Sequence, residues 1–446
     1  MNNQPSLAVA PNLLNEAEAL SIVESVIKES LAEGVFVNLT ASESALSRFS
    51  ENQISQNINR DRCQVTITSY FGKQSASVAT TELAPDALKS AIRRSEELAR
   101  FAPEDPEWVP LLAPQSYPDR TPGFDAVTAN ISPLQRGEKI HQICQISQKA
   151  GVNGSGTLST TASLQAIGNS LGLRACEMVT EADFSYTARK DNGSSWSRNS
   201  AIAVEDLPIA ATTEKVIETA MLSRNPREVK PGIYPVIFDP AAFASLLPWL
   251  IWNLDARSAD EGRSFMSSEN GNLVGEQIFS PLVQVKRDPT HPLLQSSTFF
   301  NDGLPNNYLE IIKDGIPQTL SYNRYWAQEK GKQPTGAFSP IVMNGSNASI
   351  NDLIAQTERG ILVNRAWYVR YVNPKTLEVT GMTRDGTFLI EDGQIAYPIK
   401  NLRFNQILPE MLRDIDALST VKRFGSGVVP GIRVKAFNFS SITDSV

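Results

Sequence analysis

The sequence predicts an α+β protein: an N-terminal α/β region with an antiparallel sheet, followed by a C-terminal antiparallel β-barrel-like domain. Three observations predict this class. Helical and alternating apolar patterns follow one another in the first half of the chain. Six prolines interrupt residues 102–123, and three Asp-Gly dipeptides separate short alternating runs beyond residue 308. We therefore expect an N-terminal α/β domain over 1–124 that ends in a proline-rich connector, a middle domain over 125–229 and the C-terminal β-barrel-like domain over 230–446.

The composition is typical of a globular protein without a nucleic-acid-binding surface. Of the 446 residues, 41% are hydrophobic and 20% charged, and the net charge of -7 argues against a nucleic-acid partner. The first residues lack the basic segment and apolar core of a signal peptide. The most hydrophobic stretch, Phe243–Leu254, contains Pro248 and is too short to cross a bilayer, so we expect no membrane partner. The three cysteines form no CxxC pair, which suits a reducing compartment, and we expect a cytoplasmic protein.

The first predicted element is a helix. Asn15 and Glu18 have the spacing of a capping box, and Gly34 lies where the residue after a helix end is expected. Between them, apolar residues recur at helical spacing and predict one inward face, formed by Leu20, Val23, Ile27 and Leu31.

A hairpin and a second helix are predicted next. Residues 65–71 alternate between apolar and polar side chains, and Gly72-Lys73 predicts a turn into a strand over 74–80. Pro85 then opens a helix that runs to about Phe101, with Leu88, Ile92 and Ala99 on one side.

The middle of the chain begins with an extended connector. Its prolines exclude both a helix and a central strand; they are Pro103, Pro106, Pro110, Pro114, Pro118 and Pro122. A helix over about 134–150, strands over 151–203 and a helix over about 207–224 follow, and Asn225-Pro226 ends the last helix.

The C-terminal half reads as short strands joined by turns. Residues 308–313, 377–384 and 387–391 each precede an Asp-Gly dipeptide, and 361–371 precede Asn373-Pro374. Asp-Gly suits a type I′ turn, because both central residues need a positive φ. We therefore expect an antiparallel meander that is curled into a barrel or a strongly twisted sheet.

Five segments, taken in order, carry a recognisable pattern. The first contains Arg48-Phe49 with Asn52, Ile54 and Gln56, and the second is Asn169-Ser170-Leu171-Gly172. Three more lie in the C-terminal half, at Gly360–Arg370, Thr380–Asn405 and Val428–Phe439. The order and spacing of these segments resemble the TldD/PmbA family, and the likeness spans about residues 35–445.

The resemblance implies both an architecture and an activity. It implies an N-terminal α/β region and a C-terminal barrel-like domain, assembled as a dimer around an enclosed cavity. Catalytic members of the family cut unfolded proteins or peptides in that cavity. Their zinc ion is held by a helix with the sequence His-Glu-x-x-x-His and by a cysteine near the C-terminus.

The residues that would hold this zinc are missing. Two imidazoles and a third soft ligand would bind the metal, and the Glu would act as general base on a bound water. Asp239-Pro240 has the pattern of a helix start, and the motif should fall near Leu246–Ile251, which contains only Leu, Pro, Trp and Ile. No cysteine follows Cys176. We therefore expect no catalytic residue, no metal ligand and no cofactor in this chain, with zinc only in a catalytic partner.

Replacement sites are few. His141 and Cys144 have i, i+3 spacing on a predicted helix and could bind a metal, but a surface histidine beside a buried cysteine is the commoner arrangement. His291 lies in a proline-rich loop, where we expect it to be solvated. Three carboxylates could carry acid–base chemistry, but a charge-paired surface is the simpler reading, since arginines alternate with them: Asp255, Arg257, Asp260, Glu261 and Arg263.

The C-terminal strands offer a candidate peptide-binding wall. Arg365 interrupts an apolar alternating face formed by Ile361, Val363, Trp367 and Val369. A charge that points inward needs a carboxylate, water or a bound peptide. One interpretation is a cavity lining that guides an extended substrate by strand addition, and the other is an internal salt bridge. The candidate lining residues are Arg365, Trp367, Tyr368, Arg384, Arg403 and Asn405.

The resemblance is closest to the non-catalytic TldE/PmbA-type members. It implies a subunit that pairs with a catalytic TldD-type chain as a heterodimer, or with itself as a homodimer, and that helps to hold an unfolded peptide. Two alternatives stay open: a metallopeptidase with a non-standard site, and a homodimeric peptide-binding protein without catalysis.

Overall fold

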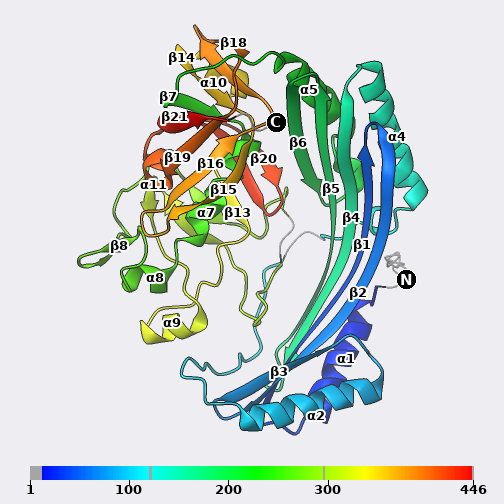
Figure 1. Cartoon of the computed structure of the whole chain (residues 1–446). Helices are drawn as coiled ribbons and strands as arrows, with labels where there is room; N and C mark the ends of the chain where they lie inside the picture. Colours follow the sequence, from blue (N-terminus) through cyan, green and yellow to red (C-terminus); the bar gives the residue numbers. More distant parts are fainter. Residues whose placement is uncertain (1–12, 120–122, 295–296, 444–446) are drawn as a thin grey trace, which may run out of the picture.

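The computed structural model describes residues 13–119, 123–294 and 297–443. The expectation about a signal peptide, as far as it concerns residues 1–12, and the predicted role of Pro122 lie outside these ranges. Figure 1 shows two parts: a long curved sheet built from the N-terminal half, and a C-terminal domain that lies against one face of that sheet. The α+β class predicted from the sequence is confirmed.

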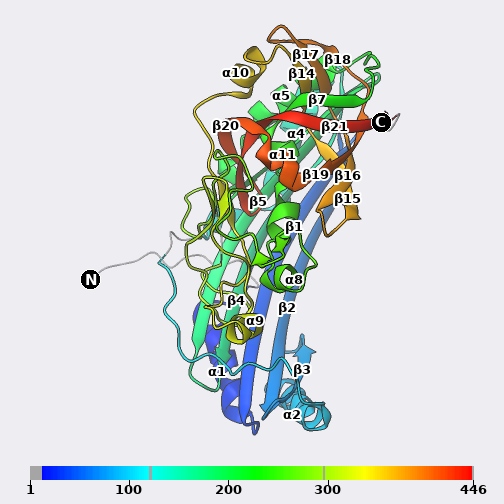
Figure 2. The same ribbon diagram turned by 90° about the vertical axis from the view of Figure 1, so that its left-hand side faces the viewer.

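The N-terminal half forms one six-stranded antiparallel sheet with the strand order β3-β2-β1-β4-β5-β6. In Figure 2, β1, β2 and β4 run along most of the length of the molecule. β1 pairs with β4 from Phe36 opposite Asn169 to Phe49 opposite Gly156, so strands from both sides of residue 124 share this sheet. The three-domain division stays a prediction. The strands are β1 (Gly34–Ser50), β2 (Gln53–Phe71), β3 (Gln74–Thr80), β4 (Asn153–Asn169), β5 (Arg174–Lys190) and β6 (Gly193–Ala201).

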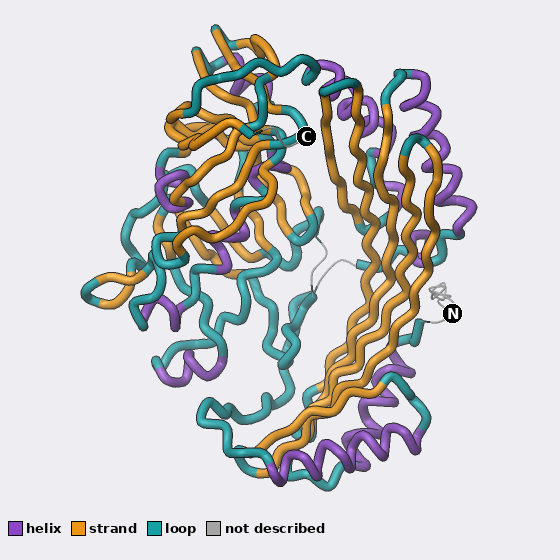
Figure 3. Tube along the Cα trace, in the orientation of Figure 1, coloured by secondary structure: helices purple, strands orange, loops and turns teal. Residues whose placement is uncertain are grey.

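Helices cover one face of this sheet, and the C-terminal domain lies on the opposite side (Figure 3). Strand alternation explains the division. In β1, Val37, Leu39 and Ala41 are buried beneath the helices, whereas Thr40 and Ser42 point the other way. The helices are α1 (Glu16–Glu29), α2 (Pro85–Phe101), α3 (Ala126–Ala129), α4 (Pro133–Lys149) and α5 (Ile209–Leu222), with a short 3₁₀ turn η1 (Val204–Asp206).

The predicted start of α1 is confirmed, and its predicted end is wrong. Asn15 and Glu18 form the capping box. The helix stops at Glu29 because the carboxylate of Glu96 accepts hydrogen bonds from the Leu31 N–H at 2.6 Å and from the Ser30 hydroxyl at 3.0 Å, which draws the chain out of the helix. Gly34 instead begins β1. The buried residues of α1 are Ala19, Val23 and Val26, and Leu31, which was expected to point inward, is 70% exposed.

The C-terminal domain is an open, branched sheet rather than a closed barrel. Its strands branch from β21, which pairs with β7, β13, β19 and β20, and in the described residues this pairing closes no ring. The strands are β7 (Gly232–Phe238), β10 (Val285–Arg287), β11 (Leu309–Lys313), β12 (Ile316–Pro317), β13 (Ile341–Met343), β14 (Arg359–Val363), β15 (Ala366–Asn373), β16 (Glu378–Thr383), β17 (Thr387–Glu391), β18 (Gln394–Pro398), β19 (Leu402–Ile407), β20 (Ile415–Phe424) and β21 (Gly427–Ile442). A separate small hairpin consists of β8 (Ser267–Ser268) and β9 (Gly271–Asn272), and the short helices are α6 (Pro240–Phe243), α7 (Leu247–Trp252), α8 (Ala256–Asp260), α9 (Arg324–Glu329), α10 (Ile350–Ala355) and α11 (Leu408–Arg413).

Two of the three predicted Asp-Gly hairpins are present. Asp314-Gly315 joins β11 to β12, and Asp392-Gly393 joins β17 to β18, with positive φ at all four residues. Asp385-Gly386 also has positive φ, but the strands on either side of it do not pair with each other: β16 pairs with β15 and β19, and β17 pairs with β14 and β18. The expected simple meander is therefore wrong at this point.

No helix in the described part of the chain is long and apolar enough to cross a membrane.

Candidate functional site

A polar cavity lies on the sheet face opposite the helices. Its volume is about 950 Å³, and β1, β2, β4 and β5 each contribute residues to its lining. Because residues opposite each other in a ladder share a face, the pairing of Thr40 with Gln165 and of Ser42 with Ser163 brings these side chains together. A second space of about 420 Å³ adjoins it, since both are lined by Ser163, Glu177 and Val179. We call this surface, formed by Thr40, Ser42, Gln64, Ser163, Gln165 and Glu177, the polar face.

The C-terminal domain closes one end of the polar face. Arg423 of β20 lies 3.2 Å from Glu181 of β5, and the two residues line the smaller space together. The Thr298 N–H donates to Glu177 at 3.0 Å, and Gln165 donates to Asn301 at 3.1 Å. At this end, the polar face therefore lies against loops and a strand of the C-terminal domain, whereas Thr40 and Gln64 are exposed.

Charges at this end of the polar face come as pairs. Arg198 of β6 donates to Asp183 at 2.9 Å, and Arg423 pairs with Glu181. Burial raises the pKa of Glu181, and the neighbouring Asp183 raises it further, whereas the two arginines oppose the rise. Hydroxyl, amide and paired ionic groups can bind a peptide backbone and polar side chains.

The sequence reasoning missed the polar face. Its signal is a run of Ser, Thr and Gln at every second position of β4, from Thr157 to Gln165. This alternation is visible in the sequence, but which face the helices cover is set by the pairing of strands far apart in the chain.

Three of the six predicted lining residues lie together. Arg365 lies between β14 and β15, where the predicted strand 361–371 is broken, and its guanidinium lies 2.5 Å from the carboxylate of Asp385. It also stacks over Trp196 of β6 at 4.0 Å and over Trp367 at 4.3 Å. Arg384 contacts the Trp367 ring at 5.3 Å and Asp385 at 3.7 Å. The internal salt bridge considered for Arg365 is therefore present, and it lies between the sheet and the C-terminal domain.

The other three predicted residues have different neighbours. Tyr368 is 58% exposed, has a φ of 56° and stacks with Arg370 at 4.1 Å. In β19, Arg403 is opposite Met382 and Asn405 is opposite Thr380. Trp367 itself is 39% exposed, so the inward apolar face expected for 361–371 is not formed as one strand. The substrate role of all six residues stays a prediction.

The segment expected to correspond to the zinc-binding helix is part of the hydrophobic core. Asp239 caps α6 through the Ala241 N–H, as the Asp239-Pro240 pattern predicts. The chain then forms two short helices, α6 and α7, instead of one long one. Leu246, Leu247, Leu250 and Ile251 are each at most 2% exposed and pack in the largest apolar cluster of the C-terminal domain.

The replacement metal sites do not assemble. His141 is exposed on α4 and bonds to Gln145 at 2.9 Å, whereas Cys144 is buried and its burial raises the pKa of its thiol. The expected surface histidine beside a buried cysteine is confirmed. His291 is half-buried instead of fully solvated, and its ring accepts a hydrogen bond from the Leu293 N–H within its own loop.

The three acidic residues after α7 all have partners, but the predicted pairing with Arg257 and Arg263 is made by Glu261. Asp255 caps α8 through the Ser258 N–H at 2.8 Å, and Asp260 accepts from the Trp326 indole at 2.9 Å. Glu261 pairs with Arg257 and Arg263.

Comparison with known proteins gives a consistent result. Residues 231–441 match the family described as the PmbA/TldA metallopeptidase C-terminal domain. The chain is 23% identical to the Escherichia coli O157:H7 protein named Metalloprotease PmbA, over 96% of this chain and 99% of that protein. It is 21% identical to the Metalloprotease PmbA homolog of Haemophilus influenzae, over 79% of this chain and 80% of the homolog. The crystal structure of TldE from Thermococcus kodakarensis superposes with a TM-score of 0.84 at 20% identity, covering 95% of this chain and all of that one, which shows a shared fold.

Proposed function

Because the chain belongs to the PmbA/TldD family, we propose that it is a non-catalytic subunit of the TldE/PmbA type. In this proposal it pairs with a TldD-type zinc metallopeptidase, completes an enclosed cavity and holds an unfolded protein or peptide there. The chain itself carries out no bond cleavage.

The observation that carries this proposal is the burial of Leu246, Leu247, Leu250 and Ile251. A zinc site needs imidazole, thiolate or carboxylate donors around an open coordination position. Leu247, Leu250 and Ile251 offer no donor atom and pack in the core. Among the residues that the structure describes, no three His, Cys, Asp or Glu side chains gather where a metal could bind. The donor groups of the described residues do not suit zinc, so the roles that we propose for the chain are binding and positioning.

The polar face supports the binding role. Each residue of an unfolded peptide presents one N–H and one C=O that need partners once water is displaced. Thr40, Ser163 and Gln165 offer hydroxyl and amide groups on one face of the sheet. The pairs Arg198–Asp183 and Arg423–Glu181 place both signs of charge at the end of the cavity for charged substrate side chains.

The partner in this proposal is a TldD-type chain, and the alternative is a second copy of this chain. A homodimer would be a peptide-binding protein without catalysis. We place the site of action in the cytoplasm, since Cys63, Cys144 and Cys176 are all free thiols, as is usual in a reducing compartment.

Elemental analysis and a cleavage assay of the purified chain test the proposal that it holds no zinc and cleaves no substrate. After incubation with zinc and gel filtration, we expect well below one zinc per chain and no cleavage of an unfolded casein substrate. About one tightly held zinc per chain, removed by a chelator together with an intrinsic cleavage activity, would show that the chain is a peptidase in its own right.

A further inference from the structure

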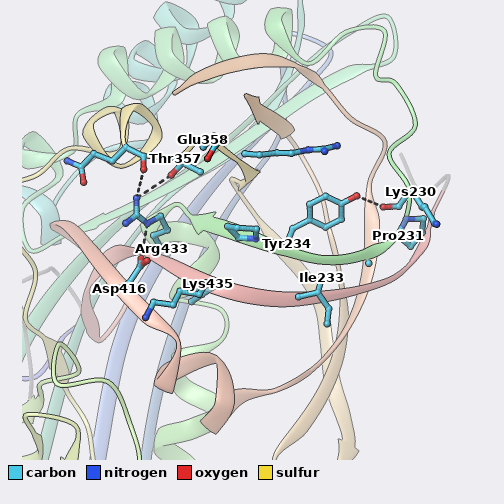
Figure 4. A pocket seen from close by; sticks show the side chains of 14 residues that line it. Lys230, Pro231, Ile233, Tyr234, Thr357, Glu358, Asp416, Arg433 and Lys435 are labelled. Carbon is cyan, nitrogen blue, oxygen red and sulfur yellow. Dashed lines mark hydrogen bonds and ion pairs between the residues drawn. The ribbon is translucent and has the colours of Figure 1, made fainter. Parts of the chain in front are cut away.

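A second cavity lies in the C-terminal domain, in a groove beside the start of β7 (Figure 4). Its volume is about 770 Å³. The groove exists because the pairing of β7 changes at Pro235, which has no N–H to donate. β7 pairs with β14 only over Val236–Phe238, and its register with β21 shifts between Val434 and Phe437. The segment Gly232–Tyr234 therefore has β21 on one side and the groove on the other. We call this cavity the β7 groove.

Positive charge dominates the β7 groove. Its lining contains Lys230, Arg359, Arg433 and Lys435, against only Glu358 and Asp416. The chain as a whole has the opposite balance, with 41 basic and 48 acidic residues. The groove is therefore a local basic site on an acidic protein.

The basic side chains of the groove differ in whether they form an ion pair within the protein. Arg433 is fixed: it donates to Asp416 at 2.8 Å and to the Gln356 carbonyl at 3.0 Å. In the described part of the chain, no carboxylate forms an ion pair with Lys230, Arg359 or Lys435. In Figure 4, Lys230 and Lys435 lie on opposite sides of Tyr234. Two free ammonium groups at separate positions suit a ligand with several spaced negative charges.

Apolar surface accompanies the charge. Ile233 is 70% exposed beside the groove, and the half-buried Tyr234 forms part of its wall, held by a hydrogen bond from its hydroxyl to the Lys230 carbonyl at 2.6 Å. An exposed isoleucine next to unpaired lysines suits a ligand that alternates apolar and acidic side chains.

We propose that the β7 groove binds an extended acidic peptide segment that also carries apolar side chains. Carboxylates of the segment contact Lys230, Arg359 and Lys435, and its apolar side chains contact Ile233 and Tyr234. A nucleic acid fits less well, because its dense phosphates would face Glu358 and Asp416. This site is separate from the polar face and does not depend on the proposed peptidase partner.

Fluorescence anisotropy on the full chain tests this proposal. The probe is a short fluorescein-labelled peptide that alternates Glu and Leu. We expect saturable binding that weakens at least about tenfold in Lys230→Glu and in Lys435→Glu, and that also weakens in Ile233→Ser. Lys149→Glu is the matched control, because this exposed lysine at the end of α4 has the same charge and lies on the other side of the molecule. Its affinity should equal that of the unmodified chain.

Three results would overturn the proposal. One is the absence of saturable binding. A second is equal weakening in Lys149→Glu, which would mean that only net charge matters. The third is displacement of the probe by a single-stranded DNA oligonucleotide or a Lys/Leu peptide as readily as by the unlabelled acidic peptide. Failure here leaves the zinc and cleavage tests of the proposed function unaffected.

Discussion

The guanidinium of Arg365 lies 2.5 Å from the carboxylate of Asp385, and the two side chains are only 15% and 2% exposed. Asp385 also accepts a hydrogen bond from the Ser194 hydroxyl of β6 at 3.0 Å. The pair thus links the six-stranded sheet to the C-terminal domain.

Removing Arg365 should destabilise the protein. In Arg365→Ala, Asp385 keeps its charge in a buried position without its main partner, and we expect a loss of roughly 3–5 kcal/mol in the free energy of unfolding. Urea unfolding measures it. Arg370→Ala is the control, since this exposed arginine stacks over the Tyr368 ring and its removal should cost under about 1 kcal/mol. Equal losses in the two variants would contradict the structural role of the pair.

The same variant decides between the two readings of Arg365. If the complex with a catalytic partner keeps full cleavage activity while the melting temperature falls, Arg365 has no substrate role. If the cleavage activity of the complex falls further than the loss of folded protein explains, Arg365 contacts the substrate as the predicted cavity lining requires.

Arg136 should be a second stability determinant, although no carboxylate contacts it among the described residues. Its side chain is fully buried and donates to the Ser47 hydroxyl at 3.1 Å, the Ile131 carbonyl at 2.9 Å and the Asn59 amide oxygen at 3.0 Å. Arg136→Met leaves these three acceptors without their donor, and we expect a loss of at least about 3 kcal/mol in chemical denaturation. Gln142→Met, on the exposed side of the same helix, should change stability by less than about 0.5 kcal/mol. If Arg136→Met changes the free energy of unfolding by less than about 0.5 kcal/mol as well, Arg136 is not a stability determinant.

Glu96 should make stability depend on pH. Burial by itself would raise the pKa of Glu96, but hydrogen bonds from the Leu31 N–H, Arg93 and Ser30 outweigh it and hold the pKa below the usual 4.5. The folded state therefore favours the charged form, so the stabilisation is complete above about pH 4.5 and is lost as pH falls through the lowered pKa. Glu96→Gln should be less stable than the unmodified chain near pH 7, and the gap should narrow near pH 3. Urea unfolding at both pH values checks this, and a constant gap would contradict it.

A bulky side chain on the polar face should block peptide binding without unfolding the protein. Ser163 is half-buried in β4 and lines both parts of the polar cavity. Ser163→Trp should leave the melting temperature nearly unchanged and lower cleavage of an unfolded substrate by the assembled complex at least about tenfold. Ser90→Trp, exposed on α2 at the helix-covered side of the sheet, should leave cleavage unchanged. Normal cleavage by Ser163→Trp would remove the polar face from the proposal.

The sequence predicted those helix ends and turns that are fixed by residues next to them in the chain. Pro85 marks the start of α2, and the predicted end at Phe101 is confirmed. The turn at Gly72-Lys73 and the capping box of Asn15 and Glu18 are also present. In each case a proline, a glycine or a side-chain cap fixes the backbone locally, whatever the rest of the chain does.

Features that depend on distant contacts were not predictable in this way. The end of α1 depends on Glu96, which is far along the chain. The break between β14 and β15 lies where Arg365 pairs with the distant Asp385, and the branching of the sheet depends on the pairings of β21 with β7, β13, β19 and β20. Sequence alternation alone predicted a continuous strand and a curled meander, because it carries no information about partner strands.

The candidate site was also predicted in part: the sequence predicted some of its residues but not the surface that depends on strand pairing. Arg365, Trp367 and Arg384 are three of the six residues predicted to line a cavity, and the structure brings these three together beside Asp385. The polar face needs four strands in register, and the alternation in β4 by itself does not say which face the helices cover.

The central claim is that this chain is the non-catalytic half of a peptidase, and reconstitution tests it most directly. The purified chain, a TldD-type chain from the same genome and an equimolar mixture are each assayed for cleavage of an unfolded casein substrate, with light scattering to follow assembly. We predict no cleavage by this chain, a heterodimer in the mixture, and cleavage by the mixture that exceeds that of the TldD-type chain alone at least about tenfold. A mixture that contains only the separate chains and cleaves no faster than the TldD-type chain alone would contradict the account.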